Sequence, residues 1–257
     1  MTTTASTTTP VILGADSDER AVRIALAAAY RLVAKFGMTD LIYTHISARV
    51  PDSHDHFLIN PYGWLFDEIT ASSLIRIDLD GNVVGDEQDT VNRAGFVIHS
   101  AIHATRPDVV CVLHTHTKAG MAVAATKSGL LPINQISMQF YDRLAYHEYE
   151  GISLDLDERE RLVRVLSHHD AMILRNHGLL TVGQSVPEAF SLMFYLNRAC
   201  EIQLAAQAMG ELVVPPAAVC EHAAQQFQAS RDNHIRNDRE WRALLRILDR
   251  DDPSYRD

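Results

Sequence analysis

The residues with the clearest chemical potential are two histidines, spaced two apart, at the end of an apolar run. His114 and His116 follow the segment 109–113, which contains three valines, a cysteine and a leucine. This composition predicts a strand buried on both faces, and residues two apart on a strand project to the same side. Neutral imidazole is a common ligand of zinc and neighbouring divalent metals. The pattern therefore predicts two ligands of one metal ion, although in a chain with 13 histidines the spacing can also arise by chance.

A second apolar run ends close to another histidine. Residues 171–174 read Ala-Met-Ile-Leu, and Arg175-Asn176-His177-Gly178 separates them from the apolar segment 179–182. Two short apolar runs joined by a polar, glycine-containing connection are typical of a β-hairpin. The sequence therefore predicts a hairpin with His177 at its bend.

The elements that must position these histidines alternate between helical and strand-like patterns. A single α/β domain with a mixed or antiparallel sheet is expected over residues 16–212, preceded by a disordered lead-in at 1–15. A helical extension is expected at 213–257, packing on the domain or on a neighbouring subunit through Trp241, Leu244, Leu245 and Leu248. The expected helices cover 16–37, 94–105, 117–129, 157–166 and 185–210, and the expected strands cover 41–50, 57–59, 75–79, 109–113, 131–138, 145–149, 171–174 and 179–182.

Composition favours a small-molecule partner. The 257 residues carry a formal charge of −10 with no cluster of lysine or arginine, which argues against nucleic acid or an anionic membrane as the partner. The cysteines at 111, 200 and 220 lie in apolar or helical contexts and are expected to be buried free thiols in a reducing compartment. The Thr-rich start lacks the features of a signal peptide, and no apolar run reaches about 18 residues. A cytoplasmic protein is expected.

Several motifs together resemble the class II aldolase/adducin family. The likeness covers residues 18–210 and includes Leu174–Leu179 placed after the His-x-His strand. Four further segments, 44–49, 57–63, 69–74 and 101–108, resemble the adducin head more closely than the sugar-phosphate aldolases.

The resemblance implies an α/β/α fold with a central, mainly antiparallel sheet of nine-stranded type. It also implies homotetramers with active sites at the subunit interfaces. One divalent metal ion per subunit is implied on His114, His116 and His177, with zinc expected and manganese, iron or cobalt as alternatives.

The sequence departs from the aldolases at positions that carry their chemistry. The aldolases have an acid/base glutamate four positions before the residue that matches His99, and this chain has Gly95 there. Of their phosphate-binding residues only the one at Gly63 is kept, and the tyrosine that they place in the neighbouring subunit falls on Ile136. A sugar-phosphate aldolase is therefore not expected.

The chemistry that remains is that of a three-histidine metal with open positions. Such a metal acts as a Lewis acid, and decarboxylation needs no base to remove a hydroxyl proton, so it tolerates glycine at position 95. The expected function is a metal-dependent carbon–carbon lyase acting on a small carboxylate, in particular a decarboxylase. An Fe(II)-dependent oxygenase on the same histidines and a non-catalytic, adducin-like interaction module are the alternatives.

Three residues are candidates for the catalytic work. His45 lies beside the site if the family fold holds, where it would bind substrate or return a proton. Arg93 falls where the aldolases hold phosphate and would suit a carboxylate, although a surface arginine explains it equally well. Tyr141 is a candidate proton donor. His99 and His103 are spaced like metal ligands on a helix, but with Ser100 between them the metalloprotease motif is incomplete, and structural hydrogen bonds are expected instead.

Overall fold

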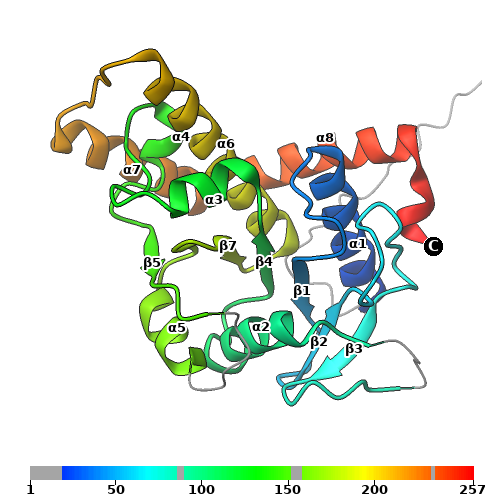
Figure 1. Ribbon diagram of the computed structural model, residues 1–257. Helices are drawn as coiled ribbons and strands as arrows, with labels where there is room; N and C mark the ends of the chain where they lie inside the picture. The colour runs from blue at the N-terminus through cyan, green and yellow to red at the C-terminus, as the bar shows by residue number, and fades with distance from the viewer. Residues whose placement is uncertain (1–18, 86–89, 152–157, 233–234) are drawn as a thin grey trace, which may run out of the picture.

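The computed structural model describes residues 19–85, 90–151, 158–232 and 235–257, so the predicted lead-in at 1–15 lies outside the described residues. These residues form one sheet in the order β3-β2-β1-β4-β7-β6-β5, in which the β5–β6 pair is parallel and all other neighbours are antiparallel (Figure 1). The α/β class and the mainly antiparallel sheet are confirmed, but within the described ranges the sheet has seven strands and the nine-stranded expectation is not met. The strands are β1 (His45–Arg49), β2 (His56–Ile59), β3 (Ile75–Asp78), β4 (Cys111–Thr115), β5 (Ala145–His147), β6 (Ala171–Leu174) and β7 (Gly178–Gly183).

Helices cover both faces of the sheet (Figure 1). Alternate residues of β4 enter different cores, because successive side chains on a strand point to opposite faces. Cys111 and Leu113 pack with α1, α3 and α6, whereas Val112 packs with α2 and α5. The helices are α1 (Glu19–Lys35), α2 (Arg93–Thr105), α3 (Lys118–Ala124), α4 (Gln135–Met138), α5 (Glu158–Leu166), α6 (Val186–Met209), α7 (Ala217–Asp232) and α8 (Ile235–Asp251), followed by the 3₁₀ turn η1 (Pro253–Arg256).

Side-chain caps fix where several helices begin. The Thr117 hydroxyl accepts the Gly120 amide at the start of α3, and Ser185 caps α6 as its sequence predicts. The strand expected at 131–138 is wrong, because Asn134 and Ser137 form a reciprocal capping box that starts the helix α4. A short run of mixed apolar and polar residues does not by itself distinguish the two structures.

The C-terminal helices pack on the same chain. Trp241 of α8 is 2% exposed and lies edge-on to Phe190 of α6, with the ring centroids 5.9 Å apart. Leu248 is buried, and Leu244 and Leu245 pack against the same core, so the predicted apolar stripe covers the domain. None of the helices in the described ranges is long and apolar enough to cross a membrane.

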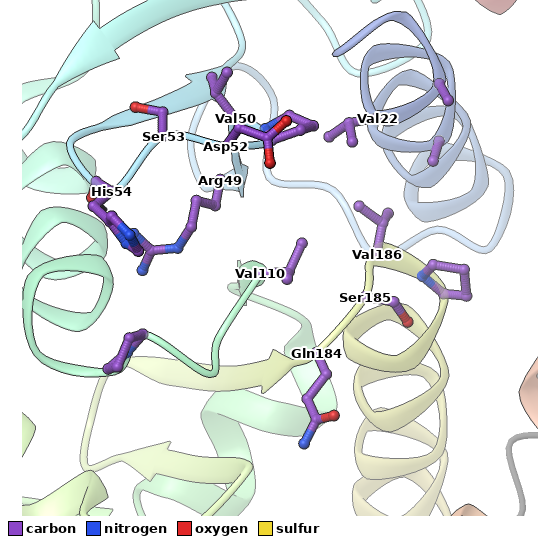
Figure 2. Close-up of a pocket in the computed structure, with 15 residues that line it drawn as sticks. Val22, Arg49, Val50, Asp52, Ser53, His54, Val110, Gln184, Ser185 and Val186 are labelled. Carbon is purple, nitrogen blue, oxygen red and sulfur yellow. Dashed lines mark hydrogen bonds between the residues drawn. The ribbon is translucent and has the colours of Figure 1, made fainter. Parts of the chain in front are cut away.

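A cleft of about 520 Å³ lies at the end of the sheet where β1 and β7 finish and β4 begins. Figure 2 shows it between the first turns of α1 and α6 and the loop that follows β1. Its floor is apolar and its edge carries exposed polar side chains, including His54 and Gln184. The apolar floor is formed by Val22, Ala25, Val50, Val110 and Val186.

Candidate metal centre

The three predicted metal-binding histidines meet at the opposite end of the sheet. Each of His114, His116 and His177 offers a ring nitrogen, and these three atoms lie within 4.8 Å of one another. The ring centroid of His177 is 4.7 Å from that of His114 and 4.9 Å from that of His116. The structure thus brings together residues that are more than 60 positions apart in the chain.

The backbone explains why the rings converge. His114 lies near the end of β4, and His116 follows two residues later, just beyond the strand. His177 lies in the tight turn between β6 and β7, where Asn176 has a φ of 55°. At Gly178 an added Cβ would lie 2.5 Å from the carbonyl oxygen of Thr115, so only glycine lets the turn approach the end of β4 this closely.

Hydrogen bonds determine which ring nitrogens are free. His114 Nδ1 lies 2.8 Å from the carbonyl oxygen of Leu179, and His116 Nδ1 lies 3.0 Å from the Asp40 carboxylate. Both oxygens can only accept, so each Nδ1 carries the proton and donates it. The Nε2 atoms of His114 and His116 then face each other across 2.9 Å as lone pairs. A cation between them relieves this contact, so the donor set fits a divalent metal.

Burial keeps His114 and His177 in the neutral form that binds metals. Desolvation, followed by the neighbouring His177 and His116, holds the pKa of His114 well below its usual range. The pKa of His177 is lowered to about 4, mainly by burial and then by the neighbouring His116. At neutral pH protons therefore compete only weakly for His114 and His177.

His45 lies directly beside this group. It pairs with His114 across β1 and β4, and the two ring centroids are 5.7 Å apart. The ring is 4% exposed, and neither of its nitrogens has a hydrogen-bond partner. Burial first, and then the neighbouring His116, lower its pKa to about 3. His45 is therefore a neutral, buried polar group with both nitrogens free for a ligand.

The two histidines of α2 have the structural contacts expected for them. The Ser47 hydroxyl lies 2.6 Å from His99 Nδ1 and 2.8 Å from His103 Nε2, and this pair of bonds joins α2 to β1. His99 also packs edge-on to His45, with the ring centroids 4.4 Å apart. The second nitrogen of each ring, His99 Nε2 and His103 Nδ1, is buried without a partner. His99 thus lies behind His45, and His103 lies one helical turn further along α2.

The other two predicted catalytic residues come from α2 and from the turn after α4. Arg93 is the first residue of α2, and its side chain lies outside the described part of the chain. Tyr141 lies in the turn after α4, a helix that packs on α6 and α7. Among the described residues, the ring contacts of the three metal-centre histidines involve histidines alone.

Two residues near the site have no signal in the sequence. Asp40 bonds to His116 across 76 positions, from the loop between α1 and β1. His147, buried at the end of β5, contributes to the lowered pKa of His177, and its carbonyl oxygen accepts the Arg175 amide at 2.8 Å. Neither residue shares a spacing pattern with the three histidines, so only the packed structure identifies them.

Comparison with known proteins agrees with this fold. The family model described as Class II Aldolase and Adducin N-terminal domain matches residues 24–204. A Caulobacter vibrioides protein named for aldolase class 2 is 47% identical over 237 residues, which cover 91% of each chain. Alpha-adducin of Mus musculus is 48% identical over 192 residues, covering 74% of this chain but 26% of adducin.

Solved structures extend the comparison to three dimensions. An aldolase II superfamily protein from Pseudomonas syringae shares 54% identity with a TM-score of 0.90, covering 95% of this chain and 98% of that protein. L-fuculose 1-phosphate aldolase from Glaciozyma antarctica shares 29% identity with a TM-score of 0.82, covering 93% of both chains. The same fold therefore occurs in an enzyme named as an aldolase.

Proposed function

The chain belongs to the class II aldolase and adducin family, and from this premise we propose that it is a divalent-metal-dependent carbon–carbon lyase. The proposed substrate is a small carboxylate, and the proposed reaction is decarboxylation. The observation that supports this most directly is the pair of bare Nε2 atoms of His114 and His116, 2.9 Å apart with His177 beside them. Zinc is the preferred metal, because neutral imidazoles suit it, and manganese, iron and cobalt are the alternatives.

Some residues of the chain would hold the metal, and others orient those ligands. His114, His116 and His177 would hold the metal, and Leu179 and Asp40 fix the orientation of the first two rings. When bound, the metal would supply Lewis-acid stabilisation of the electron pair left by carbon–carbon cleavage.

Decarboxylation fits the missing glutamate. The bond between the carboxyl carbon and its neighbour breaks, carbon dioxide leaves, and the electron pair remains on the neighbouring carbon, which then takes up a proton. No base is needed to remove a hydroxyl proton, whereas aldol cleavage requires one. Gly95 provides no carboxylate one helical turn before His99, so the chain lacks that base at the family position.

His45 is the proposed polar contact to the substrate. Its ring is neutral at pH 7 because its pKa is about 3, so it can donate one N–H to a substrate oxygen. Both nitrogens lack a partner within the protein, so binding an oxygen there would satisfy a buried polar group. Arg93 is proposed as the carboxylate-binding cation and Tyr141 as a proton donor.

Product analysis tests the reaction. Protein loaded separately with Zn²⁺, Mn²⁺, Fe²⁺ or Co²⁺ is incubated with a panel of small hydroxy-, keto- and aromatic carboxylates, and released carbon dioxide is measured. The expected result is turnover that a chelator or His114→Ala abolishes, while His54→Ala, a change at an exposed histidine in the cleft, leaves it intact. Turnover that requires oxygen would indicate an Fe(II) oxygenase instead. If the wild-type protein binds none of the four ions, the proposal is contradicted.

A non-catalytic interaction module is the second candidate, because the chain is 48% identical to alpha-adducin over 192 residues. This candidate predicts a folded protein that turns over no carboxylate when loaded with metal. His114→Ala would then leave its protein-binding properties unchanged. The product assay on the wild-type protein separates the two candidates.

The proposed assembly is a cytoplasmic homotetramer. Three buried free cysteines, Cys111, Cys200 and Cys220, suit a reducing compartment. Light scattering coupled to size-exclusion chromatography should give four times the mass of one 28.7 kDa chain. A monomer at micromolar concentration would contradict the tetramer.

A further inference from the structure

The loop between α1 and β1 brings a carboxylate to the metal centre. Asp40 Oδ2 lies 3.0 Å from Nδ1 of His116, and the Asp40 side chain is 43% exposed. The backbone of Asp40 is fixed by a bridge to Tyr43, whose amide donates to the Asp40 carbonyl oxygen at 2.9 Å. Asp40 is thus held in place by the backbone as well as by its contact with His116.

The loop reaches this position through an unusual backbone path. Leu41 and Thr44 have φ values of 50° and 68°, a region that side chains other than glycine rarely occupy. The path places Asp40 at one end of the turn and His45 at the other. Asp40 contacts His116, whereas His45 pairs with His114. A single turn therefore contacts two of the three metal-centre histidines. Non-glycine residues in this conformation are concentrated at functional sites.

The contact determines how His116 presents itself. A carboxylate accepts only, so the Nδ1 proton points to Asp40 and Nε2 is left as a lone pair facing His114. The carboxylate lies on the far edge of the ring from Nε2, so it acts through the imidazole. His114 is oriented by a neutral carbonyl oxygen, that of Leu179, whereas His116 is oriented by an anion.

We propose that Asp40 is a positioning residue of the metal centre. It fixes the tautomer and orientation of His116. The negative charge of Asp40 also makes Nε2 of His116 a stronger electron-pair donor to the metal. This inference rests on the metal centre of the proposed function and is independent of the reaction that the centre promotes. It gives the α1–β1 loop a specific role, which is to hold a metal ligand from outside the sheet.

The expected effect is moderate. Removal of a carboxylate behind a metal-binding histidine typically costs about tenfold to a hundredfold in metal affinity. Asp40 is nearly half exposed, and water screens its charge, so a loss of about tenfold is expected here. Asparagine keeps an oxygen that can accept the Nδ1 proton but lacks the charge, so its loss should be smaller than that of alanine.

Metal titration of the full-length chain tests the inference. Wild type, Asp40→Asn and Asp40→Ala are stripped of metal and titrated with Zn²⁺ against a competing chelator. The visible absorption bands of the Co²⁺-loaded proteins report the ligand field, and urea unfolding of the metal-free proteins reports the fold. Asp52→Ala is the matched control, because Asp52 is an exposed aspartate, also with a positive φ, at the cleft end of β1.

The expected result is an affinity order of wild type, then Asp40→Asn, then Asp40→Ala, with a shifted Co²⁺ spectrum in Asp40→Ala. Asp52→Ala should match wild type in both measurements. If wild type binds metal and the affinity of Asp40→Ala lies within twofold of it, the proposed role of Asp40 is overturned and the metal centre is not. A loss of affinity without any change in the Co²⁺ spectrum would also overturn it. Absence of metal binding in wild type would overturn the metal centre itself, and the role of Asp40 with it.

Discussion

The two ends of strands β1 and β4 contrast sharply although the same strands supply both. At one end His45 and His114 pair across the strands, beside buried polar atoms that have no partner in the protein. At the other end Arg49 and Val110 line a cleft of about 520 Å³. There the Arg49 guanidinium donates to the carbonyl oxygens of His54, His103, Arg106 and Val109.

The candidate site is distinguished by its unpaired buried polar atoms and not by the volume of a cleft. Among the described residues, none that lines the cleft has a buried polar side-chain atom without a partner, whereas Thr44, His45 and His99 each have at least one near the histidine end. Buried polar groups are costly when unpaired, so the unpaired atoms beside His114 suit a site that binds a ligand. The Arg49 guanidinium at the cleft is already used in holding the fold together.

The largest expected effect comes from removing a histidine at the metal end. His114→Ala should lower metal affinity about a thousandfold, because one of three ligands carries a large share of a binding free energy of about 10–16 kcal/mol. Chelator competition measures it, and His54→Ala at the cleft end is the control. Similar losses in the two variants would remove the distinction between the ends.

The next effect is on stability and belongs to the cleft end. Arg49→Met removes donors from four carbonyl oxygens and should lower the free energy of unfolding by about 2–3 kcal/mol. Metal affinity should stay within twofold of wild type. Urea unfolding and metal titration on the same sample check both. A large loss of metal affinity would show that the two ends are coupled.

Acid should destabilise the fold through the buried His103 of α2. Burial first, and then Arg49, lower the pKa of His103 from 6.5 to about 3, so below pH 6.5 the unfolded chain binds a proton that the folded chain does not. The free energy of unfolding should therefore fall as pH falls from 6.5 towards 3, by about 1.4 kcal/mol per pH unit for this residue.

Urea titrations at pH 7, 6, 5 and 4 measure this dependence. His103→Phe should reduce the slope, whatever its effect on stability at pH 7. Equal slopes for wild type and His103→Phe would rule out the assignment to His103.

The smallest effect is expected in the cleft itself. Gln184→Ala removes an exposed side chain but keeps the hydrogen bond from the backbone N–H of residue 184 to the Glu188 carboxylate. The free energy of unfolding should therefore change by less than about 0.5 kcal/mol. Metal binding should be unchanged. A substantial loss of stability or of metal affinity would mean that the exposed Gln184 side chain has a role in the fold or in metal binding.

The sequence determined the local parts of this protein. Buried strands at β4, β6 and β7, the Ser185 cap of α6 and the bend at His177 follow from short-range patterns of apolar residues, caps and turns. The family motifs pointed to the three histidines before any packing was known. The strand expected at 131–138 was wrong, since Asn134 caps this short run as a helix. The nine strands are not confirmed, because the described residues form seven and the number depends on pairing between distant segments.

Only the tertiary structure decided what surrounds the histidines. Asp40 meets His116 from 76 positions away, His147 approaches from β5, and the Ser47 hydroxyl joins His99 to His103. These contacts depend on how helices and loops pack against the sheet, and no residue spacing in the chain encodes them. The physical reason is that a side chain's ionisation and hydrogen bonding are set by the groups and the burial around it in space, which the sheet assembles from distant segments.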